Sequence, residues 1–151
     1  MKSSVKEFPI EKFAYMRRTG VYGEENYKLM ASLKEWAKAQ NLLNENTVIY
    51  GIARDNPDTT LPENCRYDAG IVIDNDFIET NGVDIGEVSS GGKYLVFTIE
   101  HTPQEVNEFW SSFLEISQKN GQEIDNNRSI LERYAKVLVD TGFCEMCVPI
   151  K

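Results

Sequence analysis

A carboxylate inside an otherwise apolar segment is the first feature with chemical meaning. If residues 129–135 form a strand, Glu132 shares one face with Ile130 and Tyr134. Burying an isolated carboxylate costs several kcal/mol, so the group must be paired, protonated or turned toward a cationic or reacting ligand. Glu132 is therefore our candidate catalytic or ligand-binding residue, and a structural pairing with Arg133, Arg66 or a backbone amide is the alternative.

A second carboxylate repeats this pattern on the segment that we expect to be the neighbouring strand. Glu145 shares a face with Phe143 and Cys147, so we expect Glu132 and Glu145 to look into one cavity. The alternative for Glu145 is a structural ion pair, or a place at the rim or on an exposed face.

Aromatic side chains are the candidates to line such a cavity. Trp36 is predicted to belong to the core, because aromatic residues at helical spacing usually pack inside. Trp110 adjoins Phe109, and only one of two consecutive helical positions can point fully inward. The full set of candidates is Tyr15, Trp36, Tyr50, Tyr67, Trp110 and Tyr134, of which we select Tyr15, Tyr50, Tyr134 and Trp110 as ligand-binding residues.

Other chemistries find little support, so we expect no metal and no cofactor. His101 has no sequence-near nucleophile or acid and sits beside a helix cap. Cys144 and Cys147 lie three apart on a strand, where they face opposite sides and act as small buried thiols. Gly91-Gly92 precedes a strand instead of a helix, so it is not a phosphate cradle. The aspartates at 55, 58, 74 and 76 lack the spacing of a calcium loop.

The elements that must position these residues follow the same order twice. The first half reads as a strand over 13–19, a helix over 24–39 with a periodic apolar stripe, and strands over 47–53 and 66–73. A further strand over 82–88 leads to the second half.

The second half reads as a strand over 94–100, a helix from Pro103, and strands over 129–139 and 143–150 joined by a tight turn at 140–142. Thr102, Pro103 and Glu105 form a helix start with a capping box, and Gly121 is a natural stop.

This order predicts one α+β domain over residues 1–151, built from two β-α-β-β repeats at about 5–80 and 82–151. The repeats form an antiparallel sheet with the helices on one face. We expect the uncovered faces of the two halves to make a concave groove, and concave apolar sites are where small ligands bind.

Composition excludes several classes of function. The 151 residues carry a formal net charge of -8, and Arg17-Arg18 is the densest basic cluster, so direct nucleic-acid binding is not expected. The segment 1–9 contains no apolar run of the kind found in signal peptides or membrane spans, so we expect a cytoplasmic protein without membrane contact.

Five short motifs resemble the GyrI-like family, and their order and spacing agree with the doubled fold. They are Asp55-Asn56-Pro57-Asp58, Arg66-Tyr67-Asp68, Ser90-Gly91-Gly92-Lys93-Tyr94, Glu132-Arg133-Tyr134, and Glu145 before Val148-Pro149-Ile150. The family includes the DNA gyrase inhibitory protein and effector-binding domains of AraC-type and multidrug-responsive regulators.

The resemblance implies a groove in which a central-strand glutamate, here matched by Glu132, contacts hydrophobic and often cationic drugs. Some stand-alone members hydrolyse cyclopropane-bearing DNA-alkylating toxins, and the regulators carry a helix-turn-helix segment for which this chain has no room. We therefore expect a stand-alone binder of small lipophilic or cationic molecules in xenobiotic defence. Cyclopropanoid hydrolysis with Glu132 as base is the enzymatic version, and passive sensing or a gyrase partnership are the alternatives.

Overall fold

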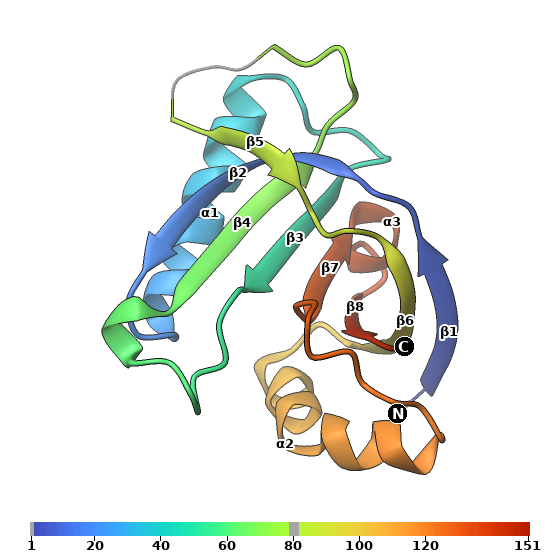
Figure 1. Ribbon diagram of the computed structural model, residues 1–151. Helices are drawn as coiled ribbons and strands as arrows, with labels where there is room; N and C mark the ends of the chain where they lie inside the picture. The colour runs from blue at the N-terminus through green and yellow to red at the C-terminus, as the bar shows by residue number, and fades with distance from the viewer. Residues whose placement is uncertain (1, 79–81) are drawn as a thin grey trace.

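Most of the strands are rich in apolar and aromatic residues, and within the residues that the structure describes the strands form one eight-stranded antiparallel sheet. The computed structural model describes residues 2–78 and 82–151 (Figure 1). The strand order in the sheet is β1-β6-β8-β7-β3-β4-β2-β5. The elements are β1 (Lys2–Phe8), β2 (Lys12–Thr19), α1 (Glu24–Ala39), β3 (Val48–Ala53), the 3-10 turn η1 (Pro62–Asn64), β4 (Arg66–Val72), β5 (Asp84–Glu87), β6 (Gly92–Glu100), α2 (Pro103–Lys119), β7 (Leu131–Ala135), α3 (Lys136–Val139) and β8 (Phe143–Pro149).

The predicted α+β class and the repeated element order are confirmed. One half contains β2, α1, β3 and β4, and the other contains β6, α2, β7 and β8. The halves meet where β3 pairs with β7, in the middle of the sheet. Outside the repeat, β5 adds to β2 in the first half and β1 adds to β6 in the second, so the N-terminal strand belongs to the sheet of the C-terminal half.

Both helices form where the sequence predicts them, for local reasons. The α1 helix runs from Glu24 to Ala39 and buries Leu33 and Ala37 against the sheet. At the start of α2, the Thr102 hydroxyl accepts a hydrogen bond from the Glu105 backbone N–H at 3.2 Å, and Pro103 takes the first helical position. Gly121 follows the end of α2 with a φ of 72°, a conformation that favours glycine.

Cross-strand pairing shows that both helices cover the same face of the sheet. Directly opposed residues share a face, and one row of such partners runs Ala69, Gly51, Glu132, Met146 and Phe97. Ala69 packs in the core cluster of α1, whereas Met146 and Phe97 pack in the core cluster of α2. Glu132 therefore lies on the helix-bearing face, in the row that links the two helix layers.

The opposite face is filled by the protein's own side chains, which corrects the predicted position of the groove. A third core cluster occupies this face, and its largest members, Phe13, Tyr50 and Tyr94, are fully buried. The sheet is curved (Figure 1), and this cluster joins residues of both halves, such as Tyr50 on β3 and Tyr94 on β6. Cys144 and Cys147 belong to clusters on opposite faces and are both buried free thiols, as predicted.

The segment predicted as a strand over 129–139 is shorter and ends in a helical turn. β7 stops at Ala135, opposite Val48, where β3 begins, and the Lys136 N–H makes a last hydrogen bond to the Thr47 carbonyl at 2.9 Å. Beyond this point β3 offers no further partner, and Lys136–Val139 forms the single turn α3. None of the described helices is both long and apolar enough to cross a membrane.

Candidate functional site

Glu132 is held at the centre of the helix-bearing face by one hydrogen bond. It lies on β7 opposite Gly51 of β3, and the hydroxyl of Tyr67, on β4, donates to its Oε1 at 2.7 Å. Among the described residues no hydrogen bond reaches Oε2. One carboxylate oxygen is thus fixed, and the other is free to meet a ligand or a water molecule.

The surroundings of Glu132 change its acidity. The side chain lies deep in the protein, and burial raises its pKa from 4.5 to about 7, although the hydrogen bond from Tyr67 acts in the opposite direction by favouring the anion. Part of the residue nevertheless remains accessible to solvent. A deep carboxylate that is still reachable, and that is about half ionised at neutral pH, is suited to accept a proton or to bind a cation.

Gly51 leaves the space that the Glu132–Tyr67 pair occupies. A Cβ atom at position 51 would collide with the Tyr67 hydroxyl and with Glu132 Oε1. Tyr67 reaches this position from β4 and Glu132 from β7, on either side of β3, so an added Cβ atom would disturb the hydrogen bond between them. A glycine in the middle of a central strand therefore has a specific role here.

Tyr134 and His101 extend the site along the same face. Tyr134 follows Glu132 by two positions on β7 and packs against the clusters of both helices. The ring of the exposed His101, just before α2, lies 5.2 Å from the ring of Tyr134. We call Glu132, Tyr67, Tyr134 and His101 the Glu132 site.

The α1 helix presents two further side chains to this site. Tyr27 and Lys34 lie seven residues apart, which places them on one side of α1 two turns from each other. Tyr27 is 71% exposed and lies close enough to Tyr67 and Tyr134 to contribute to their raised pKa values, for which burial is the main cause. The pKa of His101 is lowered by burial first and by the charge of Lys34 second.

Glu145 lies on the other face of the sheet, so the expectation that it shares a cavity with Glu132 is wrong. It pairs with Arg133 on β7, one residue beyond Glu132. Its Oε1 accepts from Arg133 Nη1 at 2.6 Å and its Oε2 accepts from Lys6 Nζ at 3.0 Å, and the residue is only 2% exposed. This is the structural ion pair that the sequence left open as the alternative.

Tyr50 belongs to the same network as Glu145. It is fully buried, its hydroxyl donates to Glu11 Oε1 at 2.7 Å, and Arg133 Nε donates to that hydroxyl at 3.2 Å. The structure thus separates Tyr50 and Glu145 from Glu132 by the thickness of the sheet.

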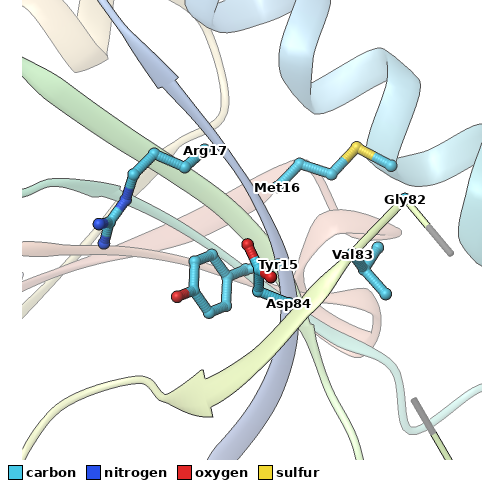
Figure 2. Close-up of a pocket in the computed structure, with 6 residues that line it drawn as sticks. All are labelled: Tyr15, Met16, Arg17, Gly82, Val83 and Asp84. Atoms are coloured by element: carbon cyan, nitrogen blue, oxygen red, sulfur yellow. The ribbon is translucent and has the colours of Figure 1, made fainter. Parts of the chain in front are cut away.

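Tyr15 also lies away from Glu132, at the outer part of the sheet. It stacks on Phe13 with ring centroids 4.9 Å apart, and it lines a surface hollow of about 430 Å³ between β2 and β5. Figure 2 shows Tyr15 and Arg17 on one side of β2 and Met16 on the other. A second hollow, of about 300 Å³, lies beside β6 and the start of α2. Neither of these two hollows includes a residue of the Glu132 site.

Trp110 lies on α2, where it is 37% exposed and packs edge-on against Phe109 and Phe113. Phe109 is the inward member of the consecutive pair, because it is fully buried. Trp110 is therefore an accessible aromatic side chain of the helix layer.

Sequence reasoning gave too small a role to two members of the site and to Gly51 beside them. Tyr67 was one aromatic candidate among six, His101 was interpreted as a helix-edge residue, and Gly51 was not singled out. The glycine within an apolar β-rich run was the available signal, because such a glycine often marks a close approach of another group.

Comparisons with known proteins point to one family. The family described as "GyrI-like small molecule binding domain" matches residues 1–151. The SPbeta prophage-derived protein YosT of Bacillus subtilis (strain 168), named as a candidate transcriptional regulator, is 39% identical over 152 residues, covering 100% of both chains.

Solved structures share the fold at low sequence identity. SAV2435 bound to tetraphenylphosphonium has a TM-score of 0.67 at 13% identity, covering 100% of this chain and 94% of that one. The C-terminal domain of EcmrR has a TM-score of 0.72 at 12% identity, covering 99% and 97%. A structure described as a hydrolase from Listeria innocua has a TM-score of 0.64 at 12% identity, covering 99% and 92%.

Proposed function

This chain belongs to the GyrI-like family of small-molecule binding domains, and we propose that it binds lipophilic molecules, cations among them, on the helix-bearing face at Glu132. The proposal depends on the position and the hydrogen bonding of the Glu132 carboxylate. It lies deep yet accessible in the row between the two helix layers, with one oxygen held by Tyr67 and the other free.

Aromatic neighbours supply the apolar part of the proposed contact. Tyr67 and Tyr134 flank the carboxylate, and Tyr27 and His101 are the exposed rings beside them. Aromatic faces attract cations and hold flat molecules, and this attraction increases when water is excluded. A delocalised cation placed here would meet the free Oε2 of Glu132 as its counter-charge.

The ligand of one relative supports this choice. SAV2435, which shares the fold, was solved with tetraphenylphosphonium, a bulky aromatic cation. We transfer the ligand class to this chain as a proposal, because Glu132 and its aromatic neighbours have the chemistry that such a cation requires.

Calorimetric titration with tetraphenylphosphonium at about pH 8 tests the proposal. The wild-type protein should bind saturably, and Glu132→Gln should weaken binding by about tenfold or more, since a partly desolvated charge pair contributes well over 1 kcal/mol. Glu45→Gln removes the same charge from an exposed loop position and should bind as the wild type does. Equal affinity of the wild type and Glu132→Gln would refute the role of Glu132.

Hydrolysis of a strained ring is a second function, favoured by the pKa of about 7 and by the free Oε2. The Glu132 carboxylate would take a proton from a water molecule while the water oxygen attacks a cyclopropane carbon. The ring C–C bond breaks, its electron pair moves into the adjoining conjugated carbonyl system, and the resulting enolate takes the proton from the Glu132 carboxyl group, which restores the carboxylate. The product is the substrate plus one water molecule, and positioning of the water supplies much of the rate.

Incubation with a cyclopropanoid alkylating agent, followed by mass spectrometry, tests this second function. The expected result is a ring-opened product heavier by one water, formed faster than in buffer, with activity lost in Glu132→Gln. Turnover by Glu132→Gln at the wild-type rate would remove Glu132 from the mechanism, and absence of product with intact cation binding would leave a binding protein without this activity.

A further inference from the structure

A basic side chain at the outer side of the Glu132 site makes no ion pair within residues 2–78 and 82–151. Lys34 is exposed on α1, and among the ion pairs of the described residues none involves it. Lys28 on the same helix does have an ion-pair partner, because its Nζ lies 3.0 Å from Glu25 Oε1.

Lys34 follows Leu33, a buried member of the α1 core cluster against which Tyr134 packs, so this turn of α1 lies beside the site. Lys34 shares a side of α1 with Tyr27, which lies near Tyr67 and Tyr134. His101, whose ring lies 5.2 Å from Tyr134, is close enough to Lys34 to respond to its charge. Tyr27 and Lys34 thus face the site from α1, two turns apart. Of the two, Lys34 lies beside His101.

The two ends of the site therefore have opposite chemistry. At the inner end, Glu132 offers a free oxygen that accepts a hydrogen bond or balances a positive charge. At the outer end, the ammonium of Lys34 and the ring of His101 offer donors. Tyr134 lies between these ends and provides an apolar surface.

We propose that Lys34 makes this site selective for amphoteric aromatic molecules, with an amine or N–H donor at Glu132 and an acidic group at Lys34. The inference rests on the proposed binding function and makes it narrower. A simple lipophilic cation satisfies Glu132 but is repelled by Lys34, whereas an amphoteric molecule satisfies both ends. Lys34 is a residue that determines specificity in this arrangement.

Two probes with opposite charge test the selectivity. The first is 5-aminonaphthalene-1-sulfonate, a fluorescent molecule that carries an aryl amine and a sulfonate on opposite sides of a naphthalene ring. The second is tetraphenylphosphonium, which has the aromatic surface and the positive charge but no acidic group. Binding of the sulfonate is followed by fluorescence and binding of the phosphonium by calorimetry. Displacement of the sulfonate by the phosphonium shows whether the two share a site.

Substitution of Lys34 should move the two affinities in opposite directions. Lys34→Ala should weaken sulfonate binding and strengthen phosphonium binding by about two- to fivefold each, the range of a solvent-screened charge pair. Lys34→Glu should increase both effects. Lys28→Glu, with the same charge change on another side of α1, should change both affinities by less than twofold, or about 0.4 kcal/mol.

The outcomes separate this inference from the proposed function. If phosphonium binds and depends on Glu132, but Lys34→Glu moves both affinities in the same direction or no more than Lys28→Glu does, the selectivity inference is overturned while the binding function stands. If the sulfonate is not displaced by phosphonium, the inference is also overturned, because the acidic probe then lies elsewhere. If phosphonium binding is absent or independent of Glu132, the proposed function itself fails.

Discussion

Replacing Glu132 by glutamine should stabilise the protein above about pH 4.5, and the full effect should be reached above about pH 7. Burial raises the pKa of Glu132 from 4.5 to about 7 in the folded protein. The difference between these values, at about 1.4 kcal/mol per pH unit, amounts to about 3 kcal/mol. Glutamine has nearly the same shape and can still accept the hydrogen bond of Tyr67, so the variant isolates the effect of ionisation.

The sign follows from proton binding in the two states. Below about pH 4.5 the group is protonated whether the chain is folded or unfolded, so it makes no difference. Between about pH 4.5 and 7 the unfolded chain loses the proton while the folded chain keeps it, so the wild type loses stability as the pH rises. Above about pH 7 the full penalty of about 3 kcal/mol is present in the wild type and absent from Glu132→Gln.

Urea unfolding of both proteins at a series of pH values measures this difference. Every other titrating group is common to the two chains, so its contribution cancels in the comparison. The advantage of Glu132→Gln in the free energy of unfolding should grow by about 3 kcal/mol between about pH 4.5 and pH 8. A difference that does not change with pH, or one that falls as the pH rises, would refute the reasoning about this carboxylate.

Further predictions concern ligand binding, two contacts within the sheet and the gyrase partnership. Affinity for tetraphenylphosphonium should fall in calorimetric titrations as the pH drops below about 7 and should level off near the affinity of Glu132→Gln, because protonation and the substitution remove the same negative charge; a flat profile would contradict this. Gly51→Ala should break the Glu132–Tyr67 hydrogen bond and destabilise the fold by about 1 to 3 kcal/mol. A melting temperature equal to that of the wild type would contradict this, because it would mean that the two side chains adjust to the added methyl group. Glu145→Ala should cost about 3 kcal/mol or more in urea unfolding, because it leaves Arg133 without its partner, and phosphonium affinity per folded molecule should be unchanged. The gyrase partnership implied by the family resemblance predicts altered supercoiling when the protein is in excess, and unchanged supercoiling would argue against it.

The sequence predicted the elements well because their signals are local. The apolar stripe of α1 and the cap at Thr102 depend only on neighbouring residues, and both agree with the structure. β1 was missed because it is a mostly exposed edge strand, held by backbone pairing with β6, and its residues show no alternation of apolar and polar types.

The sequence did not predict on which face of the sheet Glu145 lies relative to Glu132. The alternation along each strand was correct, so Glu132 and Tyr134 do share a face. Whether carboxylates on two neighbouring strands share a face depends on the register between the strands, and a slip of one residue reverses the answer. Here Glu145 pairs with Arg133 instead of Glu132, a choice fixed by the packing of both faces and not by the local sequence.

The structure of the complex with tetraphenylphosphonium tests the central claim most directly, because the claim concerns which face of the sheet receives the ligand. We expect the cation on the helix-bearing face, with a phenyl ring against Tyr134 and the free Oε2 of Glu132 turned toward the phosphonium. A cation seated instead in the hollow beside Tyr15, or on the face that holds Glu145, would contradict the account.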